Sequence, residues 1–147
     1  MNMKNMDLKY FLIIIFPRIA LSFFLFCIIL SMYIYPGSTY INHDTTKYLF
    51  NENFLSDLGR TITHGGQNNF HSSFLFNLAL VFGGITYIIF FSLTHKIFNS
   101  NTLSKIGSLL GIGGALSMIG VALTPSDLMY DPHIFFNMWI FRFFLLS

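Results

Sequence analysis

Residues 74–94 read FLFNLALVFGGITYIIFFSLT, and this stretch without a charged side chain decides the fold. As an α-helix it would measure about 32 Å, close to the roughly 30 Å hydrocarbon core of a lipid bilayer. Residues 106–124 (IGSLLGIGGALSMIGVALT) form a second uncharged run of similar length. Each run therefore predicts a helix that crosses a membrane.

The composition of the whole chain agrees with a lipid environment. Only 10% of the 147 residues are charged, against about a quarter in an ordinary soluble domain. Hydrophobic residues make up 54% of the chain, and 19 residues are phenylalanine. The formal net charge of +2 is too small and too scattered for a nucleic-acid surface, so we expect no nucleic-acid partner.

Two further apolar runs flank the central pair. Residues 10–35 are interrupted only by Pro17-Arg18, and the run is too long for the apolar part of a cleaved signal peptide. Residues 133–147 make only about 22 Å of helix, which predicts an incomplete span and a chain that continues further. We expect an all-α, polytopic transmembrane bundle in one domain over residues 1–147, with spans at about 10–35, 74–94, 106–124 and 133–147.

The basic residues predict the orientation of this bundle, because cytoplasmic loops carry an excess of lysine and arginine. Five basic residues lie at or before the start of the first span or between the second and the third: Lys4, Lys9, Arg18, Lys96 and Lys105. The opposite side holds only Lys47 and Arg60. The N-terminus is therefore expected in the cytoplasm of a multi-pass membrane protein.

The outward loop, residues 36–73, is too long to be a simple connection. Phe50, Phe54 and Leu58 recur at four-residue spacing, which is typical of one apolar stripe on a helix. This pattern predicts a short amphipathic helix over about residues 47–59, lying at the outer membrane surface or in the mouth of the bundle.

Polar and titratable residues are concentrated on the same outward side. We expect a polar pocket there, with these candidate residues: Ser56, Asp57, Arg60, His71, Asn77, Asp127 and His133. Polar groups at a membrane edge are often functional, because they are costly to bury. The alternative is purely structural, since loops normally accumulate polar residues. In that interpretation Asp57 pairs with Arg60, and water or helix ends satisfy the histidines.

Three functional hypotheses follow from this cluster. In the first, the protein has no assigned reaction and binds a membrane lipid or a partner, including other transmembrane helices or a second copy of itself. In the second, it is a membrane-embedded, metal-dependent hydrolase or transferase, or a histidine acts as general base beside Ser56. No strong zinc-ligand spacing occurs, so we expect no metal or other cofactor. A transporter is the third hypothesis, with Gly83-Gly84 and Gly113-Gly114 as places where a helix could break.

Arg142 is a separate feature, because it lies within the last apolar run, nine residues after His133. At 1.5 Å per residue it would lie about 13 Å below that histidine, near the middle of a bilayer. Two alternatives remain open. Either Arg142 faces the bundle interior and pairs with Asn77 or Ser117, or its side chain extends toward the membrane surface.

Several short motifs resemble those of domain-of-unknown-function family 998. They are Asn53-Phe-Leu-Ser-Asp-Leu-Gly59, Leu75-Phe-Asn77, Gly83-Gly84, Gly120, Thr124-Pro125-Ser126-Asp127 and His133. The resemblance covers about residues 10–147. It implies a six-helix membrane protein whose last two helices lie beyond this chain, and it singles out Ser56, Asp57, Gly59, Asn77, Pro125, Asp127 and His133. The family name carries no activity. A weaker similarity to membrane hydrolases of the ceramidase group transfers no residue.

Overall fold

The computed structural model describes residues 8–97 and 101–147, and its architecture is all-helical, as predicted. Lys4 lies outside the described residues. The elements, in chain order, are η1 (Phe11–Ile15), α2 (Phe16–Ile34), η2 (Leu55–Gly59), α3 (Phe70–Thr94), α4 (Thr102–Leu123) and α5 (Tyr130–Leu146).

Among the described residues, three helices are long and apolar enough to cross a membrane. They are Leu8–Ile34, which contains the π-helical turn η1 and then α2, together with α3 and α4. Both α3 and α4 begin about one turn before the predicted runs, because polar residues occupy their first turns. With 17 residues, α5 is shorter than these three.

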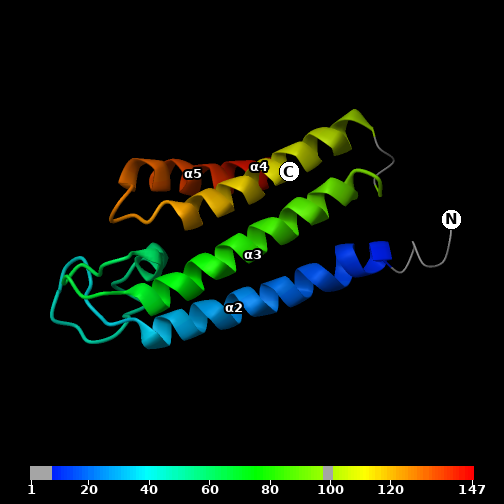
Figure 1. Ribbon diagram of the computed structural model, residues 1–147. Helices are drawn as coiled ribbons and strands as arrows, with labels where there is room; N and C mark the ends of the chain where they lie inside the picture. Colours follow the sequence, from blue (N-terminus) through cyan, green and yellow to red (C-terminus); the bar gives the residue numbers. More distant parts are fainter. Residues whose placement is uncertain (1–7, 98–100) are drawn as a thin grey trace.

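The helices pack in the order in which they occur in the chain (Figure 1). Helix α3 lies between α2 and α4, and α5 packs against α4. Because consecutive helices run in opposite directions, the loop from α2 to α3 and the turn from α4 to α5 lie at the same end of the bundle (Figure 1). We call this end the loop end. It brings together the chain segments that hold most of the candidate polar residues.

Glycines allow close contacts along α4. The Phe91 ring of α3 lies against Gly111, while the Phe136 and Phe144 rings of α5 lie against Gly120 and Gly114. A methyl group at any of these glycines would overlap the ring beside it. Small residues thus let aromatic side chains approach the backbone, as expected where no hydrophobic force drives the association of helices in lipid.

Large apolar side chains cover the outside of the bundle. The exposed fractions of Phe26, Ile29 and Leu109 are 63%, 66% and 70%. The buried core is small and lies near the loop end, where Leu58 packs with Phe76. Water would meet an extended apolar surface on such a molecule, whereas acyl chains would solvate it. This distribution agrees with a location in a membrane.

The predicted amphipathic helix over residues 47–59 is wrong, because only η2 (Leu55–Gly59), a single 3₁₀ segment, is helical. The side chain of Asn53 accepts a hydrogen bond from the Leu49 amide (3.0 Å), and that of Asp57 accepts one from the Phe54 amide (3.0 Å). These side chains satisfy amides that a helix would pair with carbonyls. The spacing of Phe50 and Phe54 was misleading, since their exposed fractions are 83% and 66%.

Candidate functional site

Asp57 organises the loop end. Its carboxylate is almost fully buried, and Oδ2 accepts hydrogen bonds from Asn53 Nδ2 and from the Phe54 amide, each at 3.0 Å. The other oxygen, Oδ1, lies 3.0 Å from His64 Nε2. The expected ion pair of Asp57 with Arg60 is therefore wrong: Arg60 Nε instead donates to the Ile62 carbonyl at 3.1 Å.

The Asp57–His64 contact fixes the histidine ring. An ionised carboxylate only accepts hydrogen bonds, so His64 Nε2 must carry the proton in this pair. The Tyr40 ring also meets the imidazole edge to face, with 5.7 Å between the ring centroids. A carboxylate and an aromatic ring thus orient His64 from two sides. Its Nδ1 atom makes no hydrogen bond to the described residues.

Asn69 connects the loop to the start of α3. Its Nδ2 atom donates to three carbonyl oxygens, those of Asp57 (3.3 Å), Leu58 (3.1 Å) and Arg60 (2.9 Å). The side chain is buried, with 1% of its surface exposed. Asn69 therefore holds the η2 segment against α3 and fixes the residues that surround Asp57.

Replacing Asn69 by alanine should lower the free energy of unfolding by about 1–2 kcal/mol, because three carbonyl oxygens, two of them in buried hydrogen bonds, lose a donor. Chemical unfolding of the purified protein in detergent micelles measures this change. Gln67→Ala is the control, since the Gln67 side chain is exposed and makes no hydrogen bond to the described residues. This substitution should change stability by less than about 0.5 kcal/mol. Equal effects of the two substitutions would contradict the role given to Asn69.

Asp127 fastens the α4–α5 turn to the loop rather than lining a site. Its carboxylate accepts hydrogen bonds from the Thr61 amide (3.0 Å), the Thr61 hydroxyl and the Ile62 amide (3.0 Å). Partial burial alone would raise the pKa of Asp127, but these donors outweigh it and lower the pKa below its ordinary value. The ionised Asp127 carboxylate thus links the two loops through hydrogen bonds.

His133 has an incomplete set of hydrogen bonds. Its Nδ1 atom lies 2.7 Å from the Thr124 carbonyl, which can only accept, so Nδ1 carries the proton. Only 3% of the residue is exposed, and Nε2 is buried without a partner among the described residues. In the neutral ring, Nε2 is left as an acceptor. Buried polar atoms are nearly always paired, so this nitrogen points to an interaction that the protein atoms do not supply.

A cavity of about 580 Å³ lies between the loop and the first turns of α5. Four predicted residues line it, namely Ser56, Asp57, Arg60 and His133, and His64 joins them. Aromatic, aliphatic and two further polar side chains complete its wall. The lining residues that the sequence did not single out are Tyr40, Phe54, Ser126, Tyr130, Ile134 and Asn137.

Three predicted site residues lie outside this cavity. His71 is exposed on the first turn of α3, where its ring meets that of Phe70. Asn77 donates to the Ser73 hydroxyl at 3.2 Å and faces a separate hollow. Asp127 makes the hydrogen bonds to Thr61 and Ile62 described above. One lining residue that the sequence analysis missed, Asn137, could have been found from the sequence, because it lies one helical turn after His133 and shares its helix face.

The described part of the chain contains no set of side chains that could bind a metal ion. No three side chains of the His, Cys, Asp and Glu types lie close enough together there to hold one ion. The residues described thus do not fit the zinc version of the enzymatic hypothesis.

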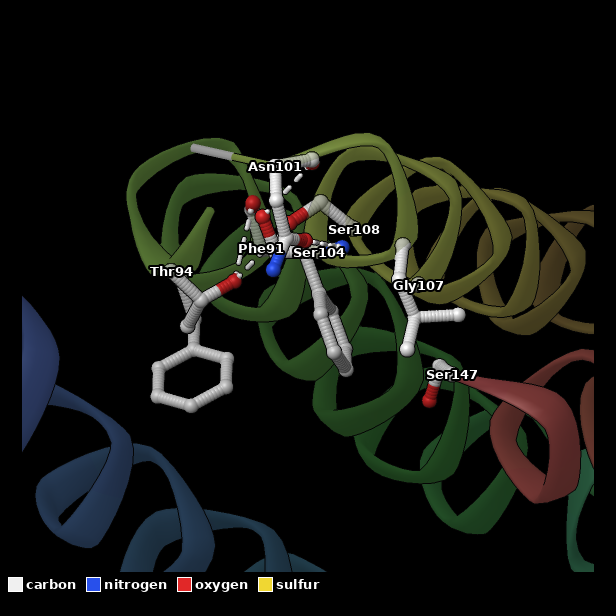
Figure 2. Close-up of a pocket in the computed structure, with 9 residues that line it drawn as sticks. Phe91, Thr94, Asn101, Ser104, Gly107, Ser108 and Ser147 are labelled. Atoms are coloured by element: carbon white, nitrogen blue, oxygen red, sulfur yellow. Dashed lines mark hydrogen bonds between the residues drawn. The ribbon is translucent and has the colours of Figure 1, made fainter. Parts of the chain in front are cut away.

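A second hollow, of about 400 Å³, lies at the opposite end of the bundle (Figure 2). Its polar side chains pair with one another or with the backbone: the Thr94 and Ser108 hydroxyls are 3.2 Å apart, and Asn101 Oδ1 accepts from the Ser104 backbone amide at 2.8 Å. Few unpaired groups remain to orient a ligand. The loop-end cavity is therefore the stronger candidate site.

Comparisons of this chain with protein-family models, with curated proteins and with solved structures found no match. The resemblance to domain-of-unknown-function family 998 stays a prediction.

Proposed function

We propose that the chain is a multi-pass membrane protein whose loop-end cavity binds the phosphate-bearing head of a membrane lipid. In this proposal α5 is a fourth span, the N-terminus is cytoplasmic and the loop end lies at the outer membrane surface.

The observation that carries this proposal is the chemistry of the cavity wall. Arg60 uses only Nε for an internal hydrogen bond, and its two terminal nitrogens make none to the described residues. A guanidinium group with free N–H donors matches phosphate oxygens in geometry and charge. His133 lines the same cavity and adds a polar ring to its wall.

The size and the rim of the cavity also suit a lipid. Its volume of about 580 Å³ lies within the usual range for small-molecule sites. Tyr40, Phe54 and Tyr130 line it and are themselves 65–70% exposed. Aromatic side chains at a membrane surface can contact the glycerol and upper acyl region, while Arg60 holds the phosphate.

Arg60→Gln should reduce the retention of an anionic lipid about tenfold, because one ionic hydrogen-bonding partner is lost. Native mass spectrometry of the protein incubated with phosphatidylglycerol in detergent measures the bound fraction. Lys47→Gln is the matched control, since Lys47 is a basic residue of the same loop outside the cavity. If both variants retain as much lipid as the unaltered protein, the proposal fails.

The enzymatic alternative rests on one observation, the carboxylate–imidazole pair of Asp57 and His64 beside Ser56. Such a pair orients a general base in many hydrolases. The Ser56 hydroxyl, however, makes no hydrogen bond within residues 8–97 and 101–147, so the link from nucleophile to base is absent in this state. Covalent labelling by a fluorophosphonate that Ser56→Ala abolishes would favour this alternative over simple binding.

A further inference from the structure

Arg142 lies level with the middle of α4. The Phe136 and Phe144 rings of α5 contact Gly120 and Gly114 of α4, and these contacts set the register of the antiparallel pair. Phe143 against Gly113 and Ser147 against Gly107 add two further contacts, and averaged over all four pairs Arg142 is level with about Gly114. That level is about 18 Å from the first residue of α4 and about 14 Å from the last, at 1.5 Å per residue. If α4 crosses a bilayer, Arg142 therefore lies near the bilayer centre.

The side chain of Arg142 does not enter the bundle. Arg142 is exposed, so pairing with Asn77 or Ser117 in the interior is wrong. Its guanidinium lies over the Trp139 ring, 5.3 Å from the ring centroid. The exposed residues on the same side of the helix recur at intervals of three and four. We call this surface the α5 outer face, made of Ile134, Phe135, Met138, Phe141, Arg142 and Leu145.

An arginine in such a position needs a compensating group. A charged side chain is costly at the bilayer centre, and those found there usually pair with other polar groups. The Trp139 ring attracts the cation but does not neutralise it. No described residue supplies a carboxylate to Arg142. In the register with α4, more than two turns of that helix lie between the level of Arg142 and either of its ends.

The described part of a second copy of this chain offers no carboxylate at that depth. Among the described residues the acidic side chains all lie at the loop end, in loops or in the first turn of α5: Asp44, Glu52, Asp57, Asp127 and Asp131. Two copies in the same orientation would instead bring like charges to the same depth. Charge complementarity therefore points to a different helix.

We propose that the α5 outer face docks a transmembrane helix that carries an Asp or Glu side chain at the depth of Arg142. The carboxylate and the guanidinium form an ion pair out of water, where such a pair is strong. Ile134, Phe135, Met138, Phe141 and Leu145 supply the surrounding apolar contact. The inference depends on α5 lying in the membrane, which the proposed function includes, and not on lipid-head binding.

The test uses a synthetic helix as the probe. The protein, labelled with a donor fluorophore, is reconstituted in phosphatidylcholine vesicles with an acceptor-labelled polyleucine transmembrane peptide that has one central Glu. We expect energy transfer to report association at least tenfold tighter than that of the same peptide with a central Leu. Arg142→Leu should abolish this preference, and Arg142→Lys should keep most of it.

Controls separate this inference from the proposed function. Arg18→Leu removes an exposed arginine near the start of the first helix and should leave the preference for the Glu peptide intact. Flotation of the protein with the vesicles confirms membrane insertion before the peptide is added, and failure there contradicts the membrane proposal itself. Equal association of the Glu and Leu peptides with inserted protein, or a preference that survives Arg142→Leu, would overturn the docking inference.

Discussion

Replacing Asp127 by alanine should lower the free energy of unfolding by about 3 kcal/mol, the largest effect expected from a polar substitution. The variant leaves the Thr61 and Ile62 amides and the Thr61 hydroxyl without their shared acceptor. Hydrogen bonds to a charged group each contribute about 1.5–3 kcal/mol, and neighbouring bonds are not fully additive. Chemical unfolding in detergent, monitored by circular dichroism, measures the loss.

The same residue should make stability depend on pH. Because the folded-state pKa of Asp127 is lower than its ordinary value of 3.8, the unfolded state binds the proton more readily. The stabilising contribution is therefore complete above that ordinary value and is lost as the pH falls through the folded-state pKa. Asp127→Ala should remove this part of the acid dependence.

Asp131→Asn provides the control for both measurements. Asp131 is exposed in the first turn of α5, and its side chain makes no hydrogen bond to the described residues. We expect a change below about 0.5 kcal/mol. If the two variants lose the same stability, the hydrogen bonds of Asp127 do not hold the two loops together.

Gly84→Ala should destabilise the protein by about 2–3 kcal/mol, because α3 and α4 would have to separate. A Cβ atom at Gly84 would lie 2.6 Å from Ile119 Cγ1 and 2.9 Å from the Ala115 carbonyl oxygen. The Ile119 side chain can move, but the backbone carbonyl of α4 cannot move without displacing the helix. Overpacking of this kind typically costs about 1–3 kcal/mol. Thermal unfolding in detergent micelles measures the effect.

Gly107→Ala is the matched substitution on α4. A Cβ atom there would meet its nearest neighbour, the carbonyl carbon of Ser147, at 3.6 Å, which is an ordinary contact. Since alanine favours helix by up to about 1 kcal/mol over glycine, this variant should be unchanged or more stable. A Gly84→Ala protein as stable as the Gly107→Ala protein would contradict the close packing of α3 on α4.

The sequence predicted the long helices because the signal for burial in lipid is a property of whole segments. Residues 74–94 and 106–124 both lie within helices, apart from Thr124. The true starts, Phe70 and Thr102, were missed because the first turns contain polar residues that carry no apolar signal. The contacts between glycines and aromatic rings depend on the relative rotation of the helices, which an apolar run does not reveal.

The loop was harder to predict, because its structure depends on individual side-chain hydrogen bonds. Asn53 and Asp57 replace the helical pattern with local contacts to backbone amides. Spacing alone could not reveal this competition. The polar cluster was predicted at one end of the bundle, and four of its residues do line one cavity. His71 does not, since its direction depends on where α3 begins.

The central claim is that the chain crosses a membrane with its loop end outside, and cysteine labelling tests it most directly. In a Cys27→Ser background, single cysteines are placed by Asn51→Cys and Met129→Cys at the loop end, and by Lys96→Cys after α3. A membrane-impermeant maleimide applied to intact cells should label the first two, and Lys96→Cys only after permeabilisation. Equal labelling of all three positions in intact cells, or recovery of the protein in the soluble fraction, would contradict the account.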